Sequence, residues 1–348
     1  MTGLLLPCPA SSPEVAALQK GSLRSDHMRT IPRPARRPPG PLAVAALTVA
    51  FALAPLTVPT GASAQAAGSL PRATELPAST RAMALGDAYM MNAGHADAIF
   101  YHPALLTGAS GFGLDVQRWG VQGTAAAASA ATQWLGGGIG VGVLTLQYDG
   151  PAGGAAAAPT GQDHLFLTGS VAVSERVLVL GYARELFGID VGVAGKLVEE
   201  RVDLDQESVA MLDVGAATDV GPIRVGLTVR DIGNDPVVPD PEAMPRVVLG
   251  AGSYGRPVGI FDVGLTAAAH WSEDRATVSG GVEVGYWPIR GRTFVARVGF
   301  QDPDDGSEMS PLSLGLAFWG DNVTAEWAFR PYGGSESAGT HRFGVRWR

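Results

Sequence analysis

The sequence contains very little with which to build thiol or metal chemistry. Of its 348 residues only Cys8 is a cysteine, and it lies upstream of the segment that we interpret below as a signal peptide. Without Cys8 the chain has no thiol for a disulfide, an iron–sulfur cluster or a cysteine-bound zinc ion. The sequence also lacks a His-Glu-x-x-His helix, a Gly-x-Ser-x-Gly elbow and a phosphate loop. We therefore expect no cofactor and no metal site. An enzyme would need groups brought together from distant strands, an alternative that the sequence alone leaves open.

Charged residues and long apolar runs are also scarce. Only 17% of the residues are charged, the mean hydropathy is +0.14, and 47 residues are glycine. Such a chain is too polar for a helical membrane protein and too rich in glycine for helices, so both facts favour β structure. Beyond position 64 there remain 19 basic and 31 acidic residues. This acidic excess makes nucleic acid an unsuitable partner.

One apolar run stands near the N-terminus and predicts export. Four arginines (Arg29, Arg33, Arg36 and Arg37) precede the run at 42–54, and Ala62 and Ala64 supply the small residues of a signal-peptidase site before Gln65. The run is shorter than the roughly 20 residues that a membrane-spanning helix needs. We expect residues 1–64 to be a leader and signal peptide that is absent from the mature chain. An n-region that begins at Met28 has an ordinary length, so a start at Met28 stays open.

Beyond the leader, apolar and polar residues alternate, which indicates strands. In the clearest case Ile223, Val225, Leu227 and Val229 share one face, and Arg224, Gly226, Thr228 and Arg230 share the other. The pattern predicts fourteen strands, at 111–119, 123–134, 138–148, 172–185, 189–201, 208–219, 222–232, 244–254, 259–271, 276–287, 292–301, 310–319, 322–330 and 340–347.

The connections between these strands favour a membrane barrel over a soluble sandwich, which alternates in the same way. Tight turns, among them Gly255-Arg-Pro, alternate with longer polar loops at 149–171, 233–243, 302–309 and 331–339. Outer-membrane barrels have short periplasmic turns, long outer loops and an even number of strands. We therefore expect an all-β protein, a transmembrane antiparallel β-barrel of about fourteen strands at 111–348, in the bacterial outer membrane and in contact with its lipid.

Aromatic residues support this expectation, because Trp and Tyr prefer the membrane interface. They stand at or beside the ends of predicted strands, namely at Trp119, Trp134, Tyr148, Trp271, Tyr286, Trp287, Trp319 and Trp347. The last strand carries Phe343, Val345 and Trp347 on one face and resembles the C-terminal signal read by the barrel-assembly machinery. That signal usually ends on an aromatic residue, whereas here Arg348 follows Trp347. The assembly machinery is thus an expected partner during biogenesis.

The segment between leader and barrel carries a family resemblance. Residues 79–89 (STRAMALGDAY) and 96–106 (ADAIFYHPALL) resemble the N-terminal signature of the PorV/PorQ family, which is related to FadL-type fatty-acid transporters. His102 stands where the family has Asn. Further similar stretches lie at 180–196, 229–234, 325–332 and 339–343. The resemblance implies that 65–110 form a linker and a small hatch, with a disordered leader as the alternative. The hatch residues that it implies are Arg81, Gly86, Asp87, Tyr89, Asp97, Tyr101, His102, Pro103 and Ala104.

The polar strand faces are expected to line the lumen. They contribute charges of both signs, at Asp190, Lys196, Asp213, Arg224, Arg230, Asp262, Glu283 and Arg297. Such a lumen is no obvious filter for cations or anions, and a salt-bridge network that fills a narrow barrel is the alternative. The resemblance implies export or transport of an apolar solute. A second hypothesis is a non-conducting adaptor that docks secretion-system components at the cell surface.

Overall fold

The structure is a computed structural model that describes residues 72–90, 94–119, 123–151, 170–202, 205–233, 245–272, 275–289, 292–302, 310–331 and 339–347. The predicted leader and its cleavage site at Ala62, Ala64 and Gln65 lie outside these residues. No helix of the described residues is long and apolar enough to cross a membrane.

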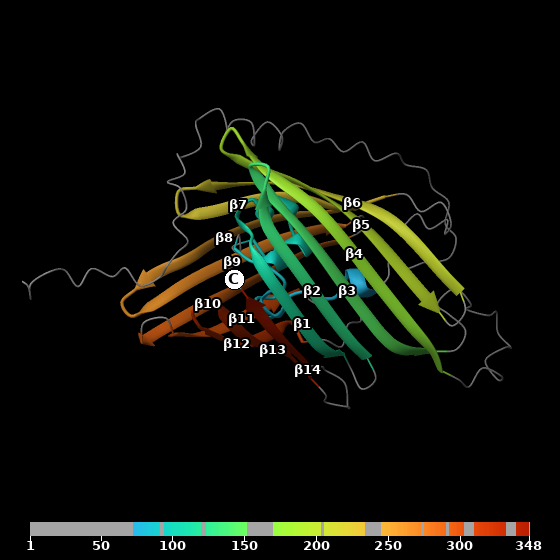
Figure 1. Ribbon diagram of the computed structural model, residues 1–348. Coiled ribbons are helices and arrows are strands. Elements are labelled where there is room, and N and C mark those ends of the chain that lie inside the picture. Colours follow the sequence, from blue (N-terminus) through green and yellow to red (C-terminus); the bar gives the residue numbers. More distant parts are fainter. Residues whose placement is uncertain are drawn as a thin grey trace, which may run out of the picture. The chain divides into compact units, whose positions relative to one another are not determined.

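The described residues form a closed barrel of fourteen antiparallel strands, which confirms the predicted fold class (Figure 1). Each strand pairs with its neighbours in sequence, and the first strand pairs with the last. The strands are β1 (Gly111–Trp119), β2 (Gly123–Trp134), β3 (Gly137–Pro151), β4 (Ser170–Leu186), β5 (Ile189–Val202), β6 (Asp205–Val220), β7 (Ile223–Ile232), β8 (Arg246–Val258), β9 (Phe261–Ser272), β10 (Arg275–Ile289), β11 (Arg292–Gln301), β12 (Leu312–Trp319), β13 (Val323–Arg330) and β14 (Thr340–Trp347).

Most strand bounds agree with the alternation to within a few residues, but one turn was predicted in the wrong place. Gly255 does not end β8. It lies inside the strand at a positive φ of 57°, where the pairing with β9 shifts between Ser253 and Arg256. Such a β-bulge uses the glycine to re-aim the strand without ending it. The chain turns later, at Gly259 and Ile260.

The two faces of the sheet are sorted in the opposite sense to a soluble protein. On β1, for example, Leu114 and Val116 are 45% exposed on the outside, whereas Asp115 and Gln117 are buried inside. A single sheet that closes on itself with its apolar face outward excludes the soluble sandwich, whose apolar face must be buried. Tyr148 is one aromatic residue that the prediction misplaced, because its hydroxyl donates a hydrogen bond to Glu175 on the inner face.

The inside of the barrel is filled by the segment that precedes β1. It contains η1 (Arg72–Thr74), α2 (Thr80–Ala84), η2 (Ala96–Phe100) and η3 (Pro103–Gly108). Ser79 begins α2, and its side chain accepts a hydrogen bond from the Ala82 amide. The apolar residues of these elements are buried. A disordered leader is therefore wrong for residues 72–90 and 94–110, which we call the hatch.

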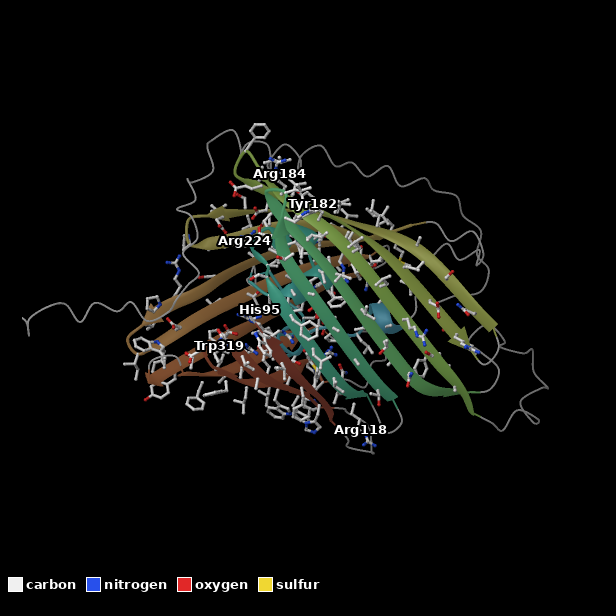
Figure 2. The ribbon with its side chains drawn as sticks, viewed as in Figure 1. His95, Arg118, Tyr182, Arg184, Arg224 and Trp319 are labelled. Atoms are coloured by element: carbon white, nitrogen blue, oxygen red, sulfur yellow. The ribbon has the colours of Figure 1, made fainter. Side chains whose placement is uncertain are left out.

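The hatch crosses the lumen from one end of the barrel to the other. At its start, the Ala73 amide donates a hydrogen bond to Glu175, which stands near the loop end of β4. At its end, the backbone of Pro103 and Ala104 approaches Gly192, three residues into β5 after a tight turn. Figure 2 labels a residue near each end of the barrel, Arg118 close to the loop after β1 and Arg184 close to the turn after β4.

Candidate functional site: the hatch and the lumen around it

The inner wall of the barrel is shaped to the hatch by glycines. A Cβ added at Gly138 would lie 1.8 Å from the Leu106 carbonyl oxygen, and one at Gly299 would lie 2.1 Å from the Gly86 amide nitrogen. Real Cβ atoms do not approach other heavy atoms so closely, because the repulsion is prohibitive. The wall glycines with a hatch atom within 3 Å of such a Cβ are Gly138, Gly140, Gly142, Gly181, Gly192, Gly215, Gly226, Gly250, Gly281, Gly299, Gly315 and Gly344. The hatch therefore touches the wall almost all the way round the barrel.

The α2 end of the hatch is held by a chain of buried ion pairs. Arg81 binds Glu283 on β10 at 2.8 Å, and Glu283 also accepts a hydrogen bond of 2.7 Å from Arg297 on β11. Arg297 reaches Glu326 on β13 at 2.9 Å. All four side chains are at most 6% exposed. Removing one member of such a chain leaves a buried charge without its partner, which typically costs about 3 to 5 kcal/mol.

Asp97 joins the two halves of the hatch to each other and to the last strand. Its carboxylate accepts hydrogen bonds from the hydroxyls of Ser79 and Tyr89 and pairs with Arg346 on β14 at 3.0 Å. Burial opposes its ionisation, but the Arg346 guanidinium, His95 and the hydrogen bonds from Ser79 and Tyr89 together outweigh burial and lower the pKa of Asp97 to about 2. Tyr101 stacks on Tyr89 with the ring centroids 4.4 Å apart, and its hydroxyl accepts hydrogen bonds from the Ala78 and Ser79 amides. Asp97 is thus charged at neutral pH and ties the hatch together.

Asp87, unlike Asp97, has a raised pKa and few partners for its carboxylate. It follows Gly86 in the turn after α2, and both residues have positive φ, 62° for Asp87. One of its carboxylate oxygens is buried and has no hydrogen-bond partner among the described residues. Burial raises the pKa of Asp87 to about 6, against the opposing field of Arg230. This turn therefore holds a strained residue whose charge is poorly compensated.

The contact of the hatch with β7 and β8 is made by side chains. Gly226 and Gly250 lie directly opposite each other on these strands. A Cβ on Gly250 would lie 1.8 Å from Cγ of Met90, and one on Gly226 would lie 2.3 Å from Cε of Met90 and 2.9 Å from Nε2 of His102. Burial lowers the pKa of His102 to about 3, so the imidazole is neutral. Met90 is unbranched and flexible, unlike the backbone atoms that touch the wall at Gly138, Gly192 and Gly299.

Other predicted lumen residues form a second cluster on β5 to β8. Lys196 pairs with Asp213 at 2.7 Å and with Asp231 at 2.8 Å, and Arg246 pairs with Asp231 at 2.6 Å. Arg230 lies 3.9 Å from Asp213. Arg246 also donates a hydrogen bond to the Thr74 carbonyl, which ties this cluster to the start of the hatch.

The remaining predicted lumen residues stand near the tight turns. Arg224 pairs with Asp190 and reaches Asp219 at 3.5 Å. Asp262 lies near the turn end of β9, is half-buried, and forms no ion pair with another described residue. Within the described ranges no group of three or more His, Cys, Asp or Glu could hold a metal ion.

Sequence reasoning missed most of the partners of these groups. Asp115, Asp231, Arg246, Glu326, Arg342 and Arg346 all take part in the buried network. A signal was present in several of them, because each of Asp115, Arg342 and Arg346 stands on the polar side of a strand whose alternate residues are apolar. Alternation places a charge inside, but it does not say which hatch residue meets it.

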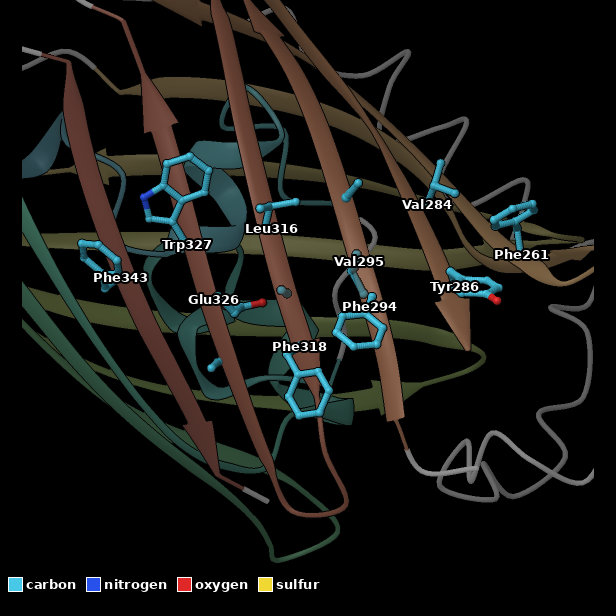
Figure 3. Close-up of a pocket in the computed structure, with 13 residues that line it drawn as sticks. Phe261, Val284, Tyr286, Phe294, Val295, Leu316, Phe318, Glu326, Trp327 and Phe343 are labelled. Carbon is cyan, nitrogen blue, oxygen red and sulfur yellow. The ribbon is translucent and has the colours of Figure 1, made fainter. Parts of the chain in front are cut away.

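The outside of the barrel carries an aromatic row near the tight-turn end. Phe261, Tyr286, Phe294 and Phe318 lie directly opposite one another on the successive strands β9 to β12. A groove of about 580 Å³ is lined by this row together with Leu316, Trp327 and Phe343 (Figure 3). A row of rings at one level, next to an apolar surface, is the pattern of a membrane-interface girdle.

The fold is similar to that of a bacterial transporter of known structure, although the sequence is not. No protein-family model matches the chain, and no curated protein matches it. The toluene transporter TodX of Pseudomonas putida aligns with a TM-score of 0.53 at 11% identity, over 76% of this chain and 96% of that one. The monoaromatic hydrocarbon channel CymD aligns with a TM-score of 0.49 at 12% identity, over 77% of this chain and 96% of that one. At these identities the likeness is one of fold.

Proposed function

We propose that the protein is an outer-membrane barrel through which apolar solutes cross the outer membrane. The observation that carries the proposal is the closed barrel with an apolar exterior, an aromatic row at one level and a hatch in its lumen. An apolar exterior of this size is unstable in water and stable in a bilayer. Likeness in fold to TodX, a toluene transporter, supports this choice of solute class.

The direct test measures entry of an apolar solute into intact Gram-negative cells, whose lipopolysaccharide leaflet slows such molecules. Cells that express the chain should take up radiolabelled toluene several times faster than cells that express it with an added disulfide between hatch and wall. Both samples must contain equal amounts of folded protein in the outer-membrane fraction. Equal uptake by the two samples would contradict the transport proposal.

A second function is favoured by the tightness of the hatch. Hatch atoms lie within 3 Å of a Cβ added at any of twelve wall glycines, and at Gly138, Gly192 and Gly299 these are backbone atoms, while buried ion pairs fix α2. A barrel sealed in this way suits a non-conducting adaptor of PorV/PorQ type, which holds secretion-system components at the cell surface. Co-purification of such components with the barrel, together with toluene uptake no faster than in cells without it, would decide for the adaptor.

Under both proposals the long loops face the cell surface and the tight turns face the periplasm. The C-terminal strand β14 presents Phe343, Val345 and Trp347 outward, and we propose that the barrel-assembly machinery reads this face. The leader would be removed before Gln65, which N-terminal sequencing of the membrane-bound protein would check.

A further inference from the structure

The seam at which the barrel closes carries buried charges that its own two strands, β1 and β14, do not balance. β1 and β14 are the first and last strands, and they pair over seven positions, from Phe112 with Trp347 to Arg118 with His341. On the inner face β14 contributes Arg342 and Arg346, both at most 2% exposed, whereas β1 contributes one carboxylate, Asp115. Two buried guanidinium groups thus meet one carboxylate across the seam.

The hatch supplies the remaining partners of the two arginines at the seam. Arg346 pairs with Asp115 at 2.8 Å through one nitrogen and with Asp97 of the hatch at 3.0 Å through another. Arg342 donates hydrogen bonds of 2.6 Å to Gln117 on β1 and to the Ala78 carbonyl of the hatch. Glu326 on β13 lies 3.6 Å from Arg346 but is already paired with Arg297 at 2.9 Å. Asp97 is therefore the carboxylate that balances the second arginine.

The hatch also bridges the two strands directly. Thr80 donates hydrogen bonds from its amide and its hydroxyl to Asp115, at 2.8 Å and 2.6 Å. Gly344 of β14 lies opposite Asp115, and a Cβ there would be 2.7 Å from both Asp115 Oδ1 and the Thr80 hydroxyl oxygen. The last strand thus lacks a side chain at Gly344, where Thr80 of the hatch hydrogen-bonds to Asp115 of the first strand.

We propose that the hatch is an internal template for closure of the barrel, in addition to any part that it plays in passage or docking. Burying Arg342 and Arg346 at the seam against one carboxylate is unfavourable, because each buried guanidinium needs a partner of opposite charge. With residues 78–80 and Asp97 in place, β14 finds its hydrogen-bond and charge partners already arranged beside β1. Closure and docking of the hatch are then one cooperative step.

The test measures how fast the seam forms in cells that export the full chain. The reporter is a disulfide between Leu114→Cys and Val345→Cys, which lie opposite each other on the outside of β1 and β14, in a chain that carries Cys8→Ser. Such a bond forms only when the two backbones are paired in register. A second reporter, Leu227→Cys with Leu249→Cys, follows the pairing of β7 with β8.

The decisive variant is Asp97→Asn, which keeps the shape of the side chain and removes the charge. We expect the seam disulfide to form at least tenfold more slowly in this variant, and the β7–β8 disulfide to form at the rate of the unchanged chain. Glu175→Gln is the matched control, because it removes the charge of a buried carboxylate on β4 that accepts a hydrogen bond from the Ala73 amide of the hatch, away from the seam. It should change the rate of the seam disulfide by less than twofold.

The charge argument has its own check in the double variant Asp97→Asn with Arg346→Gln. Removing the second arginine restores the balance around Asp115, so the seam disulfide should form within threefold of the normal rate. The proposal is overturned if Asp97→Asn leaves the seam rate unchanged, if both reporters slow equally, or if the double variant stays as slow as Asp97→Asn.

Discussion

A methyl group added to the wall at Gly192 tests whether the hatch lies where the structure has it. The Cβ of Gly192→Ala would stand 2.4 Å from the Pro103 carbonyl carbon and 2.5 Å from the Ala104 amide nitrogen. These are backbone atoms of η3, so they cannot rotate away as the tip of a side chain can. Relief requires a shift of about 1 Å in the hatch or the strand, and overpacking of this kind costs about 1 to 3 kcal/mol.

The same strand offers the control. Gly195 stands three residues further along β5 on the outer face, and a Cβ there would meet no atom within 4 Å. Gly195→Ala should be neutral or stabilise by about 0.5 kcal/mol, since alanine restricts the unfolded chain. The two free energies of unfolding should therefore differ by about 1 to 3.5 kcal/mol, measured from urea midpoints after refolding into lipid. A difference below about 0.5 kcal/mol would refute the packing of η3 against β5.

Three further predictions concern the lipid face, the turn after α2 and the seal. Leu227→Arg places a guanidinium on the apolar exterior and should cost about 2 to 4 kcal/mol, whereas Phe187→Arg, at a turn tip where the side chain is 96% exposed, should cost little in the same urea assay. Burial raises the pKa of Asp87 to about 6, so between about pH 4 and 6 this carboxyl holds its proton in the folded chain and loses it in the unfolded chain. The stability of the unchanged chain relative to Asp87→Asn, a comparison in which the other titrating groups cancel, should therefore fall by up to about 3 kcal/mol as the pH rises through this window. Met90 fills the space between the hatch and Gly226 and Gly250, so Met90→Ala should open a gap there and raise single-channel conductance in planar bilayers. Met83→Ala, which deletes the same atoms beside β13, should leave the conductance unchanged. Equal increases in conductance would contradict the role of Met90 at β7 and β8.

The barrel itself could be predicted from the sequence because its signal is local. Alternation with period two fixes which residues face outward, and turns and loops fix where each strand ends, so twelve of the thirteen connections between strands needed no knowledge of distant residues. The error at Gly255 has a local cause as well. A glycine at positive φ and a following proline are typical of a turn, and only the partner strand β9 shows that the pairing continues to Val258.

The site could be predicted only in part, because its contacts join residues that lie far apart in the chain. The resemblance of residues 79–106 pointed to Asp97 and Tyr89, but the partners of Asp97 include Arg346, almost 250 positions away. Glycines on the inner face had a detectable signal, since they recur at polar-side positions of many strands. What that signal lacked was the shape of the hatch, which decides the wall positions at which a side chain is forbidden.

The path of the hatch through the lumen has a consequence for the two ends of the chain. Fourteen strands leave Gly111 and Trp347 at the same rim, the one with the tight turns, yet the hatch carries the chain across to the loop end, where Ala73 meets Glu175. Because the hatch runs through the lumen once, the start of the hatch and the end of β14 lie at opposite rims of the barrel. If the long loops face the cell surface, as proposed above, an epitope inserted at Ala73 should be accessible to antibody on intact cells, whereas one inserted at Gly188, in the tight turn after β4, should be accessible only from the periplasm. The start of the hatch and the tight turns thus mark opposite sides of the membrane within one chain.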